Sequence, residues 1–76
     1  MTINLNRIKA ERIANGLTQN ELAKKLHWSR SKYSKRESGE VPVGADELAL
    51  IASVLHVPRD HMGIFFDFDV PKRKQK

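Results

Sequence analysis

The sequence has 76 residues, a length that allows one small domain and excludes two. It contains no cysteine, which excludes disulfides, thiolate metal sites and cysteine nucleophiles and fits a reducing compartment such as the cytoplasm. The net charge is +5, and the longest uncharged stretch, residues 48–58, is far short of the roughly 18 residues that cross a membrane. The N-terminus also lacks the apolar run of a signal peptide.

Residues 4–15 form the first predicted helix, because Gly16 follows them and glycine readily adopts the left-handed conformation that ends a helix. The second helix has a sharper start. Residues 18–21 read TQNE, a pattern in which the threonine hydroxyl and the glutamate carboxylate cap each other's backbone amides. An apolar stripe continues from there to Leu26, which predicts a helix of two turns.

A third and a fourth helix follow with similar signals. Ser29 is a cap for a helix over residues 30–38, which Gly39 ends. The fourth helix is predicted from apolar residues spaced i, i+3, i+4 and i+7, namely Leu48, Ile51, Ala52 and Leu55. A last short turn is expected over residues 59–62, before Gly63.

The C-terminal segment has the pattern of a strand. Phe66, Phe68 and Val70 alternate with Asp67 and Asp69, which gives one apolar and one acidic face. A single strand in so small a domain has no partner for its backbone amides. Pairing with the same strand of a second chain would supply one and give a twofold dimer. The alternative is that the aromatic side chains cover the domain's own helices, and the sequence leaves both open.

The charges are strongly segregated along the chain. Residues 24–36 carry six cations and no acid, whereas residues 37–70 have a net charge of −6. Two short helices joined by a turn of about three residues, the second one basic, form the helix-turn-helix unit that places its second helix in the DNA major groove. The segregation therefore suggests a polyanionic partner, although a run of cations is also typical of a solvated helix face. Residues 72–76 form either a basic arm near phosphates or a solubilising end.

A set of residues has an order and spacing that together are specific, although no single member is. The set comprises Arg12, Gly16-Leu17-Thr18-Gln19, Glu21-Leu22-Ala23, Ser29-Arg30-Ser31, Glu37, Gly39, Pro42, Leu48, Ile51-Ala52 and Leu55-His56-Val57. With it, residues 8–62 resemble the lambda repressor and Cro type of helix-turn-helix domain, also called the XRE or Cro/C1 family. The resemblance implies an all-α fold, a compact bundle of four to five short helices, and the alternating pattern of residues 66–70 adds a C-terminal extended arm or short strand. We expect the helix-turn-helix domain in residues 1–63 and the arm in residues 64–76.

The resemblance also implies roles for individual side chains. Arg12 and Glu37 match a pair that ties the first helix to the third. Ala23 falls where the two helices of the motif cross, and Tyr33 faces inward from the recognition helix. The contacts to base edges are implied for Arg30, Ser31 and Lys35.

Contacts to the DNA backbone are implied as well. Thr18 and Gln19 match positions at the amino end of the second helix, where free amides and polar side chains are offered to phosphate. From their chemistry we also expect Lys32 and Ser38 to contact phosphate. Arg30 is the favoured base reader, because an arginine at the start of a helix in the major groove donates two hydrogen bonds to guanine O6 and N7.

Three features depart from the family pattern. Arg36 stands where an apolar residue is usual, so we expect it beside the core and paired with Glu40, Asp46 or Glu47. His27 and His56 replace the usual glycine at helix ends, where the backbone often has a positive φ that histidine tolerates better than most residues. The connection over residues 42–48 is one residue longer than the common form.

The sequence lacks the usual catalytic groups of an enzyme. It has only three histidines, no cysteine and no glycine-rich phosphate loop. His56, Asp60 and His61 are close in sequence but straddle a helix end, so we expect no metal and no cofactor. We predict a sequence-specific transcriptional regulator, a repressor that binds double-stranded DNA at a palindromic operator as a homodimer, in the cytoplasm at the nucleoid. Contact with RNA polymerase stays open. The alternative is an antitoxin or another interaction module whose C-terminal arm binds a partner protein.

Overall fold

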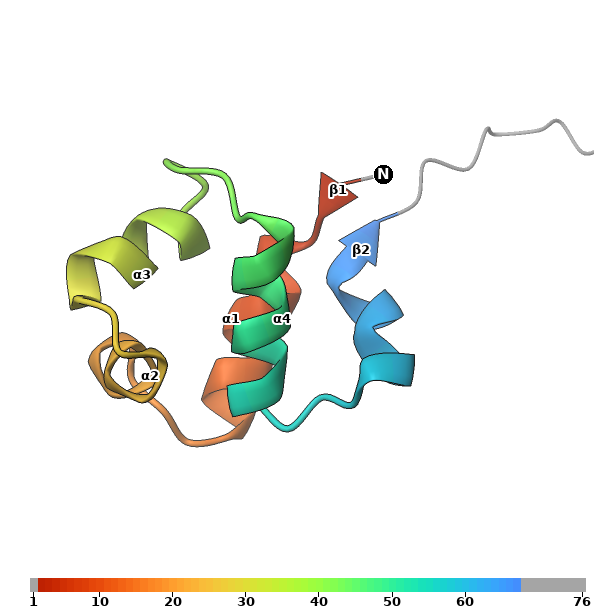
Figure 1. The fold of residues 1–76 in the computed structure, drawn as a ribbon, viewed down its shortest axis with the longest axis horizontal. Coiled ribbons are helices and arrows are strands. Elements are labelled where there is room, and N and C mark those ends of the chain that lie inside the picture. Colours follow the sequence, from red (N-terminus) through yellow and green to blue (C-terminus); the bar gives the residue numbers. More distant parts are fainter. Residues whose placement is uncertain (1, 68–76) are drawn as a thin grey trace, which may run out of the picture.

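Two central helices separate the other elements of the chain into two groups. The computed structural model describes residues 2–67. In order, they form β1 (Thr2–Ile3), α1 (Leu5–Ala14), α2 (Gln19–Leu26), α3 (Arg30–Glu37), α4 (Ala45–Val54), the 3-10 helix η1 (Arg59–Phe65) and β2 (Phe66–Asp67). In Figure 1, α1 and α4 lie between the α2 and α3 pair on one side and η1 with the strands on the other. The predicted all-α bundle is confirmed, and none of the described helices is long and apolar enough to span a membrane.

Side-chain caps determine where α2 and α3 begin. The Thr18 hydroxyl accepts a hydrogen bond from the Glu21 amide at 3.0 Å, and the Glu21 carboxylate accepts one from the Thr18 amide at 2.9 Å. The Ser29 hydroxyl accepts from the Lys32 amide at 3.1 Å. Each bond satisfies an amide that has no partner inside its helix. Both predicted helix starts are confirmed.

Left-handed residues end the helices. Among residues 2–67, positive φ angles occur at Gly16 (72°) and Gly39 (88°), and at His27 and His56 (61° each). Glycine adopts this conformation without cost, whereas a residue with a Cβ atom is strained in it. The expectation that both histidines take the place of glycine at helix ends is therefore confirmed.

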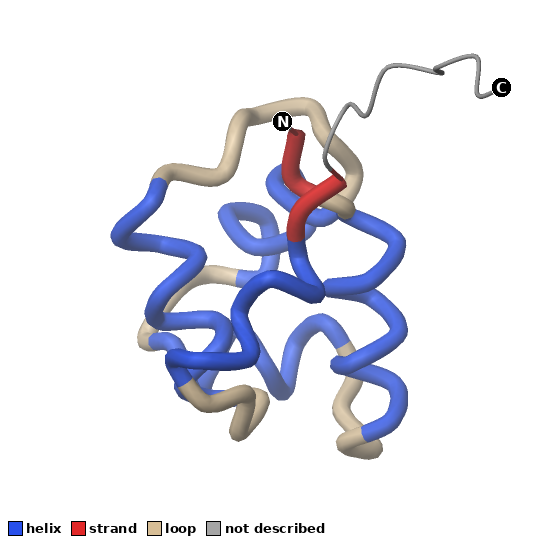
Figure 2. The backbone as a smooth tube through the Cα atoms, turned by 90° about the vertical axis from the view of Figure 1, so that its right-hand side faces the viewer, coloured by secondary structure: helices blue, strands red, loops and turns tan. Residues whose placement is uncertain are grey.

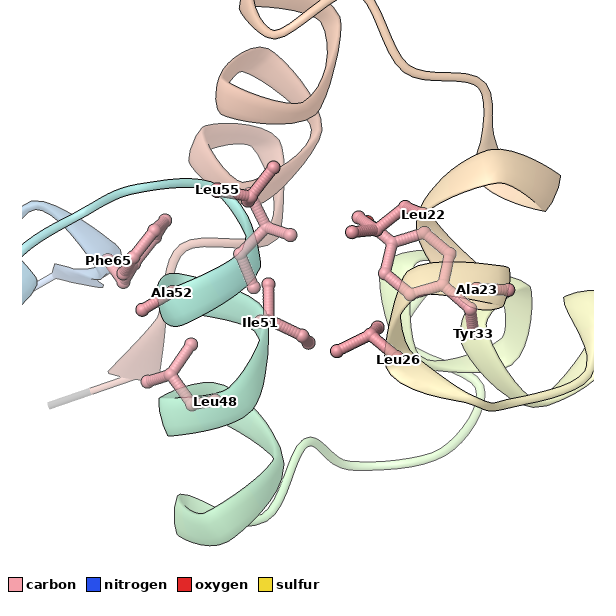
Figure 3. Close-up of a cluster of buried hydrophobic side chains, with 10 residues drawn as sticks. Leu22, Ala23, Leu26, Tyr33, Leu48, Ile51, Ala52, Leu55 and Phe65 are labelled. Atoms are coloured by element: carbon pink, nitrogen blue, oxygen red, sulfur yellow. The ribbon is translucent and has the colours of Figure 1, made fainter.

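Each described helix contributes to a single core. Its buried members are Ile8, Leu22, Ala23, Leu26, Tyr33, Leu48, Ile51, Ala52, Leu55 and Phe65. Leu22 and Tyr33 of the α2 and α3 pair point toward Ile51 and Leu55 (Figure 3). Ala23 is completely buried, so a larger side chain there would force α2 away from its neighbours.

The two ends of the described segment pair with each other. β1 and β2 are antiparallel, with Thr2 opposite Asp67 and Ile3 opposite Phe66, and they form the small sheet of Figure 2. Next to them, the Asn4 amide donates to the Phe65 carbonyl at 2.7 Å. The premise that a C-terminal strand has no partner within the chain is wrong, because the N-terminal residues supply one. Two residues are too few to show a period of two in the sequence.

The last helix extends further than the sequence predicted. η1 continues through Gly63 to Phe65 instead of ending at residue 62. Gly63 has no positive φ, so it does not act as a helix end, and the fully buried Phe65 holds the following turn against the core. The packed part of the chain therefore includes residues 64 and 65. Phe68 and Val70 lie outside the described residues.

Candidate nucleic-acid interface

Three residues join α2 to α3: His27, Trp28 and Ser29. The left-handed His27 turns the chain directly after α2, and the Trp28 amide donates to the Ala23 carbonyl at 2.9 Å. Ser29 then caps α3. The sharp turn and the small buried Ala23 hold two short helices against each other, which is the geometry of a helix-turn-helix unit.

One carboxylate, that of Glu37, anchors the inward side of α3. Its Oε2 accepts from Arg12 Nε at 2.9 Å and from Tyr33 Oη at 2.5 Å. Its Oε1 accepts from Gln19 Nε2 at 2.8 Å and from Arg12 Nη2 at 3.3 Å. Arg12 also donates from Nη1 to the Leu17 carbonyl at 2.7 Å. The side chains of Arg12 and Glu37 are only 10% and 5% exposed, so this Glu37 cluster locks α1, α2 and α3 together in a place that excludes water.

The Glu37 cluster perturbs the pKa values of its members. Burial raises the pKa of Glu37, but hydrogen bonds from Arg12, Tyr33 and Gln19 outweigh it, and the pKa lies below the ordinary glutamate value. For Tyr33, burial and the hydrogen bond to Glu37 both raise the pKa. The hydrogen bond to Glu37 raises the pKa of Arg12 as well. The cluster therefore holds one anion, one cation and one neutral phenol near neutral pH.

A second set of contacts fixes α3 to α4 and to the turn. Arg36 Nε donates to Glu47 Oε1 at 2.9 Å, so of the three acids proposed as its partner it pairs with Glu47. Arg36 and Lys32 both lie on the Trp28 ring, with the Arg36 guanidinium carbon at 5.5 Å and Lys32 Nζ at 4.5 Å from the ring centroid. Cations at this distance are attracted to the ring face. The Gly44 amide also donates to Glu47 Oε1, at 3.0 Å. The hydrogen bonds from Arg36 and from Gly44 lower the pKa of Glu47.

The outward side of α3 is polar and basic. Arg30, Ser31, Lys32 and Lys35 are exposed. An open hollow runs along this side, and its lining residues are Arg30, Ser31, Ser34, Lys35 and Glu40. The three residues implied as base readers are thus exposed and line the same hollow, whereas the side chains of Tyr33 and Glu37 on the same helix are buried.

A model of the Cro/C1-type helix-turn-helix family matches residues 8–62, which include α2, the turn and α3. The chain belongs to this family. It is a DNA-binding transcription regulator of the Cro/C1 type. No curated protein and no solved structure matches it.

The residues implied as phosphate contacts in this Cro/C1-type regulator already have partners within the chain. Gln19 donates to Glu37, and the Thr18 hydroxyl accepts from the Glu21 amide. Lys32 lies over the Trp28 ring. The Ser38 hydroxyl donates to the Lys35 carbonyl at 3.1 Å.

Sequence reasoning missed two contacts that shape this surface. The hydrogen bond from Gln19 to Glu37 joins residues 18 positions apart, and no local sequence pattern predicts it. Trp28, Lys32 and Arg36 recur at intervals of four, and this spacing is a signal that could have predicted their stacking.

A metal site is a separate question, since His56, Asp60 and His61 are close in sequence. Within residues 2–67, no group of three or more histidine or acidic side chains is placed to hold a metal ion. His56 lines a hollow between α4 and η1 together with Pro58, Arg59 and Met62, and this lining offers a single ligand of the kind that binds zinc.

Proposed function

We propose that this Cro/C1-type regulator is a repressor that binds a roughly palindromic operator as a homodimer, with α3 in the major groove. The observation that carries the proposal is the division of α3 into two sides. Tyr33 and Glu37 are locked inward, which leaves Arg30, Ser31 and Lys35 on the outer surface. A rigid inner side suits recognition, because base contacts require side chains held in a fixed register.

Arg30 is the principal base reader in this proposal. It is the first residue of α3 and is exposed, and its guanidinium can donate two hydrogen bonds to guanine O6 and N7. Lys35 reaches a guanine edge from the next turn of α3. Ser31, between Arg30 and Lys35 in the sequence, accepts or donates a hydrogen bond as the base requires.

Phosphate contacts position the chain in the same proposal. A glutamine amide has two N–H donors, so Gln19 can donate to Glu37 and to a phosphate at the same time. The Thr18 hydroxyl accepts from an amide and keeps its proton for a phosphate. Lys32 retains three donors above the Trp28 ring. Ser38 is the weakest of the four candidates for a phosphate contact, because its hydroxyl proton is already donated to the Lys35 carbonyl.

The homodimer is proposed through the C-terminal segment. Half-sites of a palindrome lie about 34 Å apart and match a twofold protein. Phe66 packs partly against the chain's own core and is opposite Ile3, so Phe68 and Val70, outside the described residues, are the side chains we assign to the partner contact. Occlusion of polymerase is the simplest mode for a dimer of this size, and its site of action is the nucleoid in the cytoplasm.

The test selects bound fragments from random duplex DNA. A symmetric motif with half-sites about one helical turn apart, bound with an affinity that falls steeply with salt, supports the proposal. Retention that does not respond to salt and recovers no motif contradicts it.

The dimer is tested by measuring the size of the purified chain and of a chain that ends at Asp67. Removal of residues 64–76 is unsuitable, because it would also take Phe65 out of the core. A dimer that becomes a monomer on truncation supports the assignment. A monomer that copurifies with another protein supports the antitoxin alternative instead.

A further inference from the structure

The loop after α3 brings an acid to the surface that faces DNA in the proposed function. Gly39, with its φ of 88°, turns the chain back at the end of α3. The Val41 amide then donates to the Lys35 carbonyl at 3.1 Å, and the Glu40 amide donates to Ser38 Oγ at 3.3 Å. These bonds fix the backbone of Glu40 beside α3, where Glu40 lines the same hollow as Arg30 and Lys35.

Glu40 differs from the other glutamates near α3. Glu21 caps α2, Glu37 anchors α3, and Glu47 binds Arg36 and caps α4. Glu40 is exposed, and within residues 2–67 its carboxylate has no hydrogen-bond or ion-pair partner. No hydrogen bond or ion pair of the described residues therefore accounts for an acid at this position.

A carboxylate on a DNA-facing surface needs a donor, because phosphates repel it and an unpaired charge loses hydration there. Duplex DNA offers few donors in the major groove: the exocyclic amino groups at cytosine N4 and adenine N6. The cations Arg30 and Lys35, on the same hollow, offset the repulsion between Glu40 and neighbouring phosphates.

We propose that Glu40 is a specificity-determining residue that accepts a hydrogen bond from a base amino group, cytosine N4 or adenine N6, beside the base that Arg30 or Lys35 contacts. The proposal rests on the proposed function and extends it, since it adds an anionic acceptor to a reading surface whose other charged side chains, Arg30 and Lys35, are donors. It predicts that each half-site contains one position where the wild-type protein requires an amino group in the major groove.

The experiment selects binding sites from random duplex DNA with the wild-type protein and with Glu40→Ala. The wild-type motif should contain a fixed cytosine or adenine that becomes degenerate in the Glu40→Ala motif, while the other positions stay unchanged. The base recovered distinguishes the two amino groups. In titrations, the wild type should discriminate against a change at that position by about 5- to 150-fold, and Glu40→Ala should lose this discrimination.

Two further variants separate reading from charge. Glu40→Gln keeps the shape and an acceptor oxygen but adds donors, so it should shift the preference toward adenine, which glutamine contacts through N6 and N7. Asp60→Asn makes the same change of charge in η1, at the other end of the molecule from α3 (Figure 1), and should leave the motif unchanged.

The outcomes are distinct. An unchanged motif with affinity raised by the same factor on every sequence means that Glu40 only repels phosphate, which overturns its role as a reader and leaves the proposed function intact. A wild-type protein that recovers no motif overturns the proposed function and the role of Glu40 with it. The Trp28 fluorescence of each variant confirms that it is folded.

Discussion

Arg12 and Glu37 lie 25 residues apart in the chain and meet through two hydrogen bonds, at 2.9 and 3.3 Å, with both side chains almost fully buried. Arg12 is in α1 and Glu37 is the last residue of α3. The pair therefore determines how the end of α3 lies against α1. Because Tyr33 and Gln19 donate to the same carboxylate, one acid controls the orientation of the surface that we assign to DNA.

Replacing Glu37 should destabilise the protein far more than breaking an exposed ion pair. Glu37→Gln leaves the buried Arg12 guanidinium without an opposite charge, and we expect a loss of about 3 kcal/mol in the free energy of unfolding. Urea unfolding followed by Trp28 fluorescence measures it. The matched control is Arg7→Gln, which breaks the Arg7–Glu11 pair, where Arg7 is 45% exposed, and should cost less than about 0.5 kcal/mol. Equal losses in the two variants would contradict the anchoring role of Glu37.

The lowered pKa of Glu37 gives stability a dependence on acidic pH. Its pKa is below the unfolded value of about 4.3, so its contribution is fully present above that value and is lost as the pH falls through the folded-state pKa. We expect the wild-type free energy of unfolding to decrease below about pH 4.3 more steeply than that of Glu37→Gln. Urea midpoints across this range measure the difference. Parallel curves would show that the decrease comes from other carboxylates.

The raised pKa of Tyr33 predicts the opposite dependence at alkaline pH. Its contribution is present below the unfolded value of about 10 and is lost as the pH rises, because only the unfolded chain ionises readily there. Tyr33 is the one tyrosine in the sequence, so tyrosinate absorbance reports it alone and should appear together with unfolding. Tyr33→Phe should have a flatter alkaline profile, because it has no phenol to ionise. Ionisation of Tyr33 in the folded protein would contradict its burial beside Glu37.

Local signals predicted α2, the turn and α3 well, because capping bonds span three residues and are visible in the sequence. The capping box of Thr18 and Glu21 and the left-handed His27 are of this kind. The pairing of β1 with β2 was missed, since each strand has two residues and the partners lie at opposite ends of the described segment. No periodicity can arise over two residues.

Contacts of the candidate interface were harder to predict than its helices. The position of Gln19 at the start of α2 suggested phosphate, whereas its bond to Glu37 depends on how α2 and α3 pack. The extension of η1 to Phe65 depends in the same way on a space in the core that only the folded chain defines. At Gly63 tertiary packing overrode a local signal, since this residue resembles a helix end in sequence but lies inside η1.

Arg30 provides the most direct prediction for DNA binding. Arg30→Ala removes two donors at the start of α3 and should weaken binding to the selected operator by about 1 to 3 kcal/mol, with little change on random DNA. Lys32→Ala removes a cation that we assign to phosphate, so it should weaken binding to all sequences similarly and reduce the salt dependence by about one counterion. Fluorescence anisotropy with labelled operator and random duplexes, at several salt concentrations, measures both effects.

The control for Arg30 is Arg59→Ala, which removes an exposed arginine from η1, away from α3. It should change neither the operator affinity nor the preference for the operator over random DNA, because a charge beyond about 10 Å is largely screened at ordinary salt. If Arg30→Ala weakens operator and random DNA by the same factor, Arg30 contacts phosphate and not a base edge. In that case base reading by α3 would have to start from Ser31 and Lys35, and the register of the helix in the groove would differ from the one proposed.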